Sequence, residues 1–384
     1  GAARSRPEPP RAMRPFRIGV LGGGAMGSLW AARLAPVAAS LSPRPLPSTA
    51  PSAAAAGGGQ DANDVWIYTR WQEHARRIQE QRGVWYQPLE GSRSLRSCQA
   101  SDSVDEILNN GGPMDIGFVF VKGKEATYTS GVAAHELLRP GGILVTLQNG
   151  MGHEEILRFA AGASMKLAIG TTTVGATVEP GIVTLRGEGE TVIARGKYSK
   201  DRRSGTLDAV SVGKIMRNAG FSTNIVPPEE KLCMLWKKLI VNASINPITA
   251  LFGIQNGAIH ADEPHGVRSL AEGVATEAAL VAQKIGLKGF SVEDSIQSVM
   301  RVSLNTRFNT SSMLTDVRNG KKTEIETITG WVCSEADRLE IDVPLNKKLL
   351  YHIRNIENSP GSERTVVAVE DLLNFQEIPL KGRK

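Results

Sequence analysis

The chain has 384 residues, of which 41% are hydrophobic and 22% are charged, and it carries a formal net charge of +6. This length predicts two or three domains with ample material for buried cores, and no apolar run is long enough to span a membrane. The densest basic run (195–205) lies among glycine and serine and predicts a solvated loop, so nucleic acid is not an expected partner.

The cysteine content bears on the compartment. Three cysteines without a paired spacing, Cys98, Cys233 and Cys333, favour a reducing environment, so we expect a cytoplasmic protein. Residues 1–15 are rich in arginine and proline and predict a disordered tail. Such a tail could also be part of a transit peptide, which leaves a mitochondrial location as the alternative.

The first part of the chain alternates between strand and helix patterns. FRIGVL (16–21), GGGAMG (22–27) and SLWAARLA (28–35) predict a strand, a glycine turn and a helix. Residues 36–60 are rich in Ala, Pro, Ser and Gly and predict a disordered surface insertion. Further strands are expected at 64–70, 116–122, 142–150 and, in shorter pieces, up to about 196, with helices at 125–138 and 208–220. This alternation predicts a doubly wound α/β domain of the Rossmann type over 16–226.

The pattern becomes helical after Pro227-Pro228. Helices are expected at 229–246, 264–286, 291–307, 311–319 and 323–340. Asn319-Gly320 suits the end of the fourth, and Thr323 with Glu326 matches a capping box that would open the fifth. The sequence therefore predicts an all-α domain over 227–375, and a small-molecule site between the two domains.

The glycine turn has the spacing of a dinucleotide-binding motif. Gly22, Gly24 and Gly27 form G-x-G-x-x-G between a strand and a helix, the context in which this motif is specific. The first glycine permits a tight turn, the second lets a pyrophosphate approach the backbone, and the third lets helix and strand pack closely. A purely structural glycine turn is the less favoured interpretation.

The end of the second strand indicates which dinucleotide is bound. Once the 25 residues of 36–60 are left out, Arg70 lies 18 residues after Gly27, where NAD-binding proteins usually carry an acid. An arginine there can bind a 2′-phosphate through two N–H groups, which favours NADP(H). A solvated arginine remains the alternative. Lys122 and Asn149 stand at the ends of two later strands and could reach cofactor or substrate, or be plain turn residues.

The stretch KKLIVNASINP (237–247) suggests a polar stripe on an apolar helix. Lys238, Asn242 and Asn246 are four residues apart, so they drift by only about 40° per step around a helix. Asparagine is a poor residue for a helix interior, so two on one line favour a polar cleft over a solvated face. Lys237 lies about 100° away and is expected in solvent. Pro247 removes an N–H, so the helix is expected to kink or end there.

Six ordered blocks carry a family resemblance. They are GGGAMG (22–27), VKGKEA (121–126), QNGMG (148–152), WKKLIVNASINPITAL (236–251), QNG (255–257) and SSMLTDVRNGKKTEIE (311–326). Together they resemble the ketopantoate reductase family over about residues 16–356. Departures are Gly123 where Ala is common, Ile248 in place of Leu, and the insertion at 36–60.

The resemblance implies a fold, an activity and residue roles. It implies a Rossmann domain followed by an all-α domain of the 6-phosphogluconate dehydrogenase type, and NADPH-dependent reduction of 2-dehydropantoate to (R)-pantoate in pantothenate and coenzyme A biosynthesis. Lys238 matches the general acid and Glu324 the active-site glutamate. The implied substrate-binding residues are Asn149, Asn242, Asn246, Asn256 and Ser312. The implied cofactor-binding residues are Gly22, Gly23, Gly24, Ala25, Met26, Gly27, Arg70, Lys122, Asn149 and Glu324.

In the expected mechanism, Lys238 protonates the substrate oxygen as NADPH delivers hydride to C2, and Glu324 orients the lysine. Without their neighbours, Ser312 could instead be a helix cap and Glu324 a first-turn acid. A paralogue reducing another 2-keto acid and a non-catalytic NADP-binding protein are the alternative functions. His260 and His265 have a loop-like setting, so no metal site is expected. A homodimer is possible.

Overall fold

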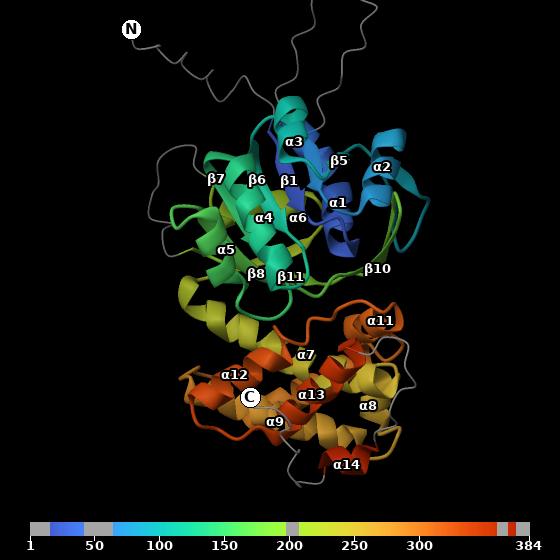
Figure 1. Ribbon diagram of the computed structural model, residues 1–384, viewed down its shortest axis with the longest axis vertical. Helices are drawn as coiled ribbons and strands as arrows, with labels where there is room; N and C mark the ends of the chain where they lie inside the picture. Colours follow the sequence, from blue (N-terminus) through green and yellow to red (C-terminus); the bar gives the residue numbers. More distant parts are fainter. Residues whose placement is uncertain (1–15, 42–63, 197–206, 359–367, 374–384) are drawn as a thin grey trace, which may run out of the picture. The chain divides into compact units, whose positions relative to one another are not determined.

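The structure is a computed structural model that describes residues 16–41, 64–196, 207–358 and 368–373 (Figure 1). The predicted tail (1–15) lies outside the described residues. The chain forms two compact units. The first comprises the chain up to Gln148 together with Glu154–Pro228, and the second comprises Asn149–His153 together with the chain from Glu229. A short segment of the sheet-bearing half thus belongs to the helical unit.

The first unit is built on an eight-stranded sheet in the order β12-β11-β8-β7-β6-β1-β2-β5. Its strands are β1 (Ile18–Leu21), β2 (Val65–Tyr68), β5 (Gln99–Ser101), β6 (Met114–Val119), β7 (Leu138–Thr146), β8 (Lys166–Thr172), β11 (Glu190–Ala194) and β12 (Ser222–Val226). The strands from β5 to β8 are parallel, and β11 runs antiparallel to β8. Every residue of β1 and β6 is buried, as expected for central strands covered on both faces. The chain order reverses between β1 and β6, which is where such sheets bind ligands.

Helices pack against this sheet (Figure 1). They are α1 (Ala25–Leu41), α2 (Gln72–Gln81), α3 (Val104–Gly111), α4 (Lys124–Leu137), α5 (His153–Ala161) and α6 (Ala209–Asn218). The helix α1 packs against α6, and α3 packs against α4. The α/β class predicted from the alternating pattern is confirmed. The short helices α2, α3 and α5 were not predicted from the sequence.

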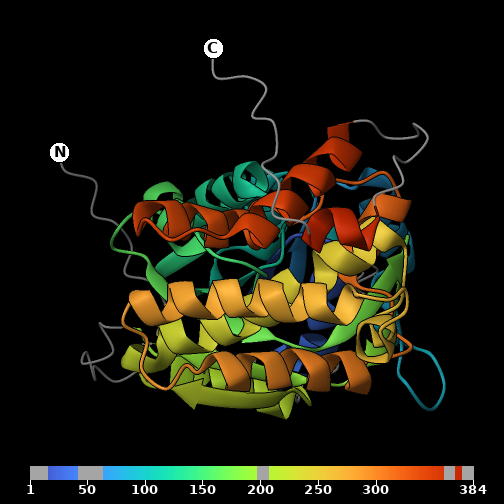
Figure 2. The ribbon, with the colours of Figure 1, turned by 90° about the horizontal axis from the view of Figure 1, so that it is seen from below.

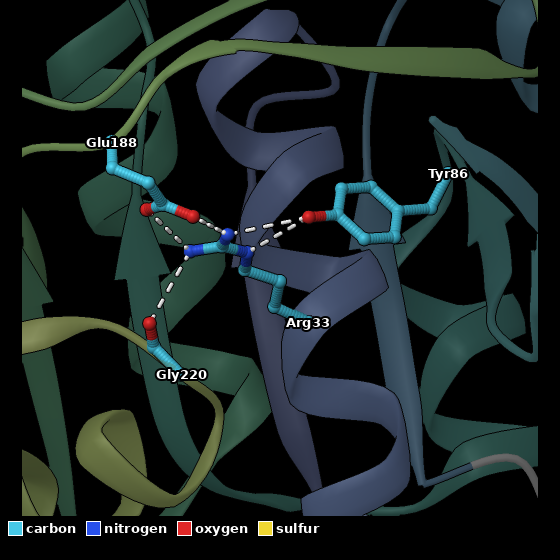
Figure 3. A network of polar contacts seen from close by, with 4 residues as sticks. All are labelled: Arg33, Tyr86, Glu188 and Gly220. Atoms are coloured by element: carbon cyan, nitrogen blue, oxygen red, sulfur yellow. Dashed lines mark hydrogen bonds and ion pairs between the residues drawn. The ribbon is translucent and has the colours of Figure 1, made fainter. Parts of the chain in front are cut away.

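A second, four-stranded sheet in the order β4-β3-β10-β9 packs on α1. Its strands are β4 (Ser94–Arg96), β3 (Val84–Gln87), β10 (Ile182–Gly187) and β9 (Gly175–Glu179). Arg33 links α1 to this second sheet. Its guanidinium donates to the Tyr86 hydroxyl of β3 at 3.2 Å and forms an ion pair with Glu188 (Figure 3). The same guanidinium donates to the carbonyl of Gly220 at 3.5 Å.

The predicted boundary of the insertion was wrong at its start. Pro36 and the residues up to Leu41 continue α1, whereas disorder was expected from residue 36. Val37 and Ala38 are buried in the core of the first unit, so packing stabilises this last turn and a half. Pro36 is exposed, which keeps its ring away from that core. Residues 42–60 of the insertion lie outside the described residues.

The second unit consists of helices around its own apolar core. They are α7 (Lys231–Phe252), α8 (Gly257–Ala261), α9 (Val267–Lys284), α10 (Val292–Asn305), α11 (Ser312–Arg318), α12 (Thr329–Arg338), α13 (Pro344–Asn358) and α14 (Val369–Leu373). Figure 2 shows α9 between α10 and α13, and it also packs on α7. Small buried residues such as Ala271, Ala275 and Ala278 line α9 and let its neighbours approach closely. Over the residues described, no helix combines the length and apolar character needed to cross a membrane.

Two helix boundaries differ from the predictions. The helix α7 does not end at Pro247 but runs on to Phe252. The helix expected from residue 323 begins only at Thr329. The Thr323 hydroxyl accepts from Ile325 N at 3.1 Å, so it stabilises a turn and not the predicted capping box with Glu326. Asn319 ends α11 and Gly320 follows with a φ of 61°, as the Asn-Gly pair predicted.

Candidate functional site

Each glycine of the motif has the environment that a dinucleotide requires. Gly22 has a φ of +115°, and a Cβ there would lie 2.9 Å from the backbone of Phe120. A Cβ on Gly27 would lie 1.8 Å from the Gly22 carbonyl oxygen, so only glycine lets α1 approach the turn. Gly24 is exposed with no atom within 4 Å of its Cβ position, leaving room for a pyrophosphate. These residues fit a dinucleotide cofactor, whose phosphates the free N–H groups of α1 would hold.

Arg70 and Lys122 follow strands that flank this turn. The strands β2 and β6 are the two neighbours of β1, and both run parallel to it. Arg70 is exposed just beyond β2, and Lys122 is exposed just beyond β6. The sheet therefore brings both cations to the edge that carries the glycine turn. Ala25 and Met26 begin α1 at the same edge.

The second unit brings Lys238, Glu324 and Asn149 together. The Asn149 amide donates to the Glu324 carboxylate at 3.1 Å. The Glu324 side chain is only 8% exposed, and its charge acts directly on the Lys238 ammonium. Burial lowers the pKa of Lys238 to about 8, while Glu324 acts in the opposite direction and raises it. The result is a lysine that is still largely protonated at neutral pH but gives up its proton more readily than usual.

A loop and a turn hold Asn149 and Glu324 in place. The Met151 N–H donates to the Thr327 carbonyl at 2.8 Å. Gly150 lies so close to this turn that a Cβ would be 2.5 Å from the same oxygen. The N–H groups of Thr327 and Ile328 both donate to the Glu324 carbonyl, which fixes the turn from within. The loop 149–153 therefore depends on the turn 324–328 for its position.

The polar stripe of α7 is present as predicted. Lys238 and Asn242 are half-buried, and Asn246 is buried, while Lys237 is exposed. None of these three side chains is exposed, so the stripe is not a solvated face of the helix. Pro247 is buried within the helix, so packing of the surrounding core offsets the hydrogen bond that proline cannot make.

Asn256 and Ser312 have different surroundings in the second unit. The Asn256 amide donates to Thr306 Oγ1 at 2.9 Å, and its Oδ1 is buried without a hydrogen-bond partner among the described residues. Such an orphaned acceptor is costly unless a ligand donates to it. Ser312 is exposed at the first position of α11, and the cap is its neighbour Ser311. Ser311 also accepts from Thr249 Oγ1 of α7 at 2.7 Å, which fastens α11 to α7.

Sequence reasoning missed three residues that support the site. The Ser311 cap, the Thr327 turn and His153, whose Nε2 lies 2.8 Å from the Asn149 carbonyl, all act through backbone contacts. No periodicity or motif marks such contacts, although the pair Ser311-Ser312 at the start of α11 could have suggested a cap. Within the described ranges, no three His, Cys, Asp or Glu residues are grouped to hold a metal ion.

Comparisons with known proteins identify relatives of both units. The family description "Ketopantoate reductase PanE/ApbA" matches residues 59–198, and its C-terminal counterpart matches residues 232–357. The 2-dehydropantoate 2-reductase of Halobacterium salinarum is 33% identical over 77% of this chain and 91% of its own. The enzyme of the same name from Archaeoglobus fulgidus is 35% identical over 64% of this chain and 77% of its own.

Solved structures share the fold. A PanE/ApbA family ketopantoate reductase from Ralstonia eutropha has a TM-score of 0.70 at 22% identity, covering 89% of this chain and 99% of its own. D-mandelate dehydrogenase with NADH and anilino(oxo)acetate has a TM-score of 0.72 at 19% identity, covering 91% of this chain and 100% of its own. The two family matches and the long alignments with curated relatives, together with the glycine turn and the lysine-bearing helix, establish that the chain belongs to the ketopantoate reductase family.

Proposed function

We propose that this protein reduces 2-dehydropantoate to pantoate with NADPH as the reductant. The observation that carries the proposal is the pairing of Lys238 with Glu324, because it supplies a proton donor whose pKa burial lowers to about 8. A reductase of a 2-keto acid needs such a donor for the carbonyl oxygen. Bound NADPH supplies the hydride for C2.

The residues of the second unit have distinct roles in this proposal. The Lys238 ammonium hydrogen-bonds the substrate carbonyl and stabilises the negative charge that develops on oxygen. It then transfers its proton to that oxygen. Glu324 keeps the lysine charged and is itself oriented by Asn149. Asn242, Asn246, Asn256 and Ser312 bind the carboxylate and hydroxyl groups, and the orphaned Oδ1 of Asn256 suits a substrate hydroxyl.

The preference for NADPH over NADH is assigned to the first unit. Arg70 is exposed at the position where the adenosine ribose lies in this fold, and its fork of N–H groups matches a 2′-phosphate. Lys122 beyond β6 adds a second positive charge at the same edge. No acid occupies the end of β2, where one would bind the 2′-hydroxyl of NAD.

The test is a spectrophotometric panel that follows oxidation of NADPH and NADH with 2-dehydropantoate and with other 2-keto acids, including benzoylformate and 2-ketoisovalerate. We expect the highest kcat/KM with NADPH and 2-dehydropantoate. A higher kcat/KM with another acid would reassign the substrate, and a higher value with NADH would contradict the role of Arg70. Binding of NADPH without turnover of any acid would indicate a non-catalytic protein.

A further inference from the structure

An exposed tryptophan follows the arginine at the end of β2. Trp71 is 37% exposed, a high value for so large an apolar side chain. Its indole is stacked on the imidazole of His74, with ring centroids 4.8 Å apart and an angle of 16° between the planes. The histidine thus fixes the plane of the indole while part of the ring remains open to solvent.

Hydrogen bonds at both ring nitrogens hold the His74 imidazole in place. Its Nδ1 accepts the N–H of Gly181 at 3.0 Å, and its Nε2 lies 2.9 Å from the Ser28 hydroxyl. A neutral imidazole has one acceptor and one donor, so Nε2 carries the hydrogen and donates to Ser28. Burial lowers the pKa of His74 to about 4, which keeps this neutral form at physiological pH. The ring beneath Trp71 therefore cannot rotate without losing two hydrogen bonds.

The same segment is fastened to the glycine turn. The Gly22 N–H donates to the Tyr68 carbonyl at 2.9 Å, and a Cβ on Gly23 would be 2.7 Å from Thr69 Oγ1. The Ser28 hydroxyl that receives the His74 hydrogen lies 3.3 Å from the Gly23 carbonyl and donates to it. The position of Trp71 is thus tied to the loop that would hold the cofactor phosphates.

We propose that the open surface of the Trp71 indole is the stacking platform for the adenine ring of the dinucleotide. The proposal rests on the proposed NADPH-dependent function. In this fold the adenosine ribose lies at the end of the second strand, so the attached adenine must lie near the residues that follow β2. Stacking on the indole would remove apolar surface of both rings from water, and every purine offers a face for it. His74 acts as a positioning residue that presents the indole.

The test measures binding of adenosine 2′,5′-bisphosphate, which contains the adenine and the 2′-phosphate but no nicotinamide. Calorimetric titration would compare the parent protein with Trp71→Ala, Trp71→Phe and the control Trp85→Ala, whose tryptophan is 36% exposed on β3. We expect Trp71→Ala to raise Kd about tenfold, equal to about 1.4 kcal/mol and within the range of base stacking on aromatic rings, with Trp71→Phe in between. The control should match the parent. Equal Kd values for Trp71→Ala and the parent would overturn the proposal.

A fluorescence measurement separates stacking from a loosened loop. A stacked adenine should quench the indole emission, so saturation with the bisphosphate should quench the parent and Trp85→Phe. Trp71→Phe should lose that quenching even when saturated. If the bisphosphate still quenches the fluorescence of Trp71→Phe, the adenine does not stack on Trp71 and the proposal is overturned. If the parent binds neither NADPH nor the bisphosphate, the platform and the proposed function both fail, whereas binding of the bisphosphate without reductase activity contradicts the proposed function alone.

Discussion

At the scale of single residues, Lys238 is expected to determine the rate of the chemical step. Replacing a positioned general acid typically lowers a rate by about 10²–10⁴-fold. We predict a loss of this size in kcat for Lys238→Ala with a nearly unchanged KM for NADPH, because the glycine turn belongs to the other unit. The control is Lys237→Ala, since Lys237 is the exposed neighbour. A kcat for Lys238→Ala close to that of the control would refute the role of this lysine.

The pH dependence follows from the same side chain. Its pKa is lowered to about 8, so the proton needed for reduction is held below that pH and is lost above it. We predict that kcat falls as the pH rises through about 8. Glu324 raises the pKa of Lys238, so Glu324→Gln should move this fall to lower pH. If the fall of kcat stays at the same pH in Glu324→Gln, or moves to higher pH, then the fall reports the titration of a group other than Lys238.

Arg70 gives a prediction about cofactor choice. A hydrogen bond to a charged group contributes about 1.5–3 kcal/mol, or roughly a 10- to 100-fold change in binding. Arg70→Ala should therefore raise KM for NADPH by that factor and leave KM for NADH nearly unchanged. Arg76→Ala is a matched control, because Arg76 is an exposed arginine of the adjoining helix α2. An equal rise of KM for NADPH and for NADH would mean that Arg70 does not bind the 2′-phosphate.

At the scale of elements, the loop 149–153 and the turn 324–328 act as one support for Glu324, the proposed partner of Lys238. Gly150 has a φ of +84°, and its Cβ position lies 2.5 Å from the Thr327 carbonyl. We predict that Gly150→Ala pushes Asn149 off Glu324 and lowers kcat more than it raises KM for NADPH. Gly220→Ala has a similar φ of +84° with open space around it and serves as the control for backbone strain alone. If the two variants had equal kcat and KM, the contact between the loop 149–153 and the turn 324–328 would not be needed to position Glu324.

Elements with strong periodicity or a motif could be predicted from the sequence, and elements set by tertiary contacts could not. The strand, the glycine turn and the helix up to residue 35 follow from local signals, and so does the stripe of Lys238, Asn242 and Asn246. Two prolines misled the prediction in the same way, because Pro36 and Pro247 lie inside helices that packing maintains. Local propensity carries no information about that packing.

The proposed catalytic pair, Lys238 and Glu324, shows the same difference between local signals and tertiary contacts. Glu324 and Lys238 are far apart in the sequence, and only the family resemblance connected them. The turn that carries Glu324 is held by contacts with Glu357 and with the loop at 149–153, which no local pattern reveals. Asn149 was expected near cofactor and substrate, but its bond to Glu324 could be known only from the fold.

At the scale of the whole molecule, the two units have separate apolar cores. A ligand that binds only the folded protein stabilises it by about 2.7 kcal/mol at a concentration of 100 times Kd. If NADPH is held by the first unit, this stabilisation should act first on the core that contains Ile67 and only secondarily on the core that contains Leu349.

A destabilised second unit makes this expectation testable. Leu349 is fully buried in α13, and Leu349→Ala should cost about 2–5 kcal/mol. In this variant we predict faster hydrogen exchange of the amides of α9 and unchanged exchange in β1, measured by mass spectrometry. Saturating NADPH should slow exchange in β1 and leave exchange in α9 unchanged, because NADPH binding stabilises the core of the first unit. Equal protection of β1 and α9 by NADPH would show instead that the two units unfold as one, so that cofactor binding stabilises the helices of the second unit as strongly as the glycine turn.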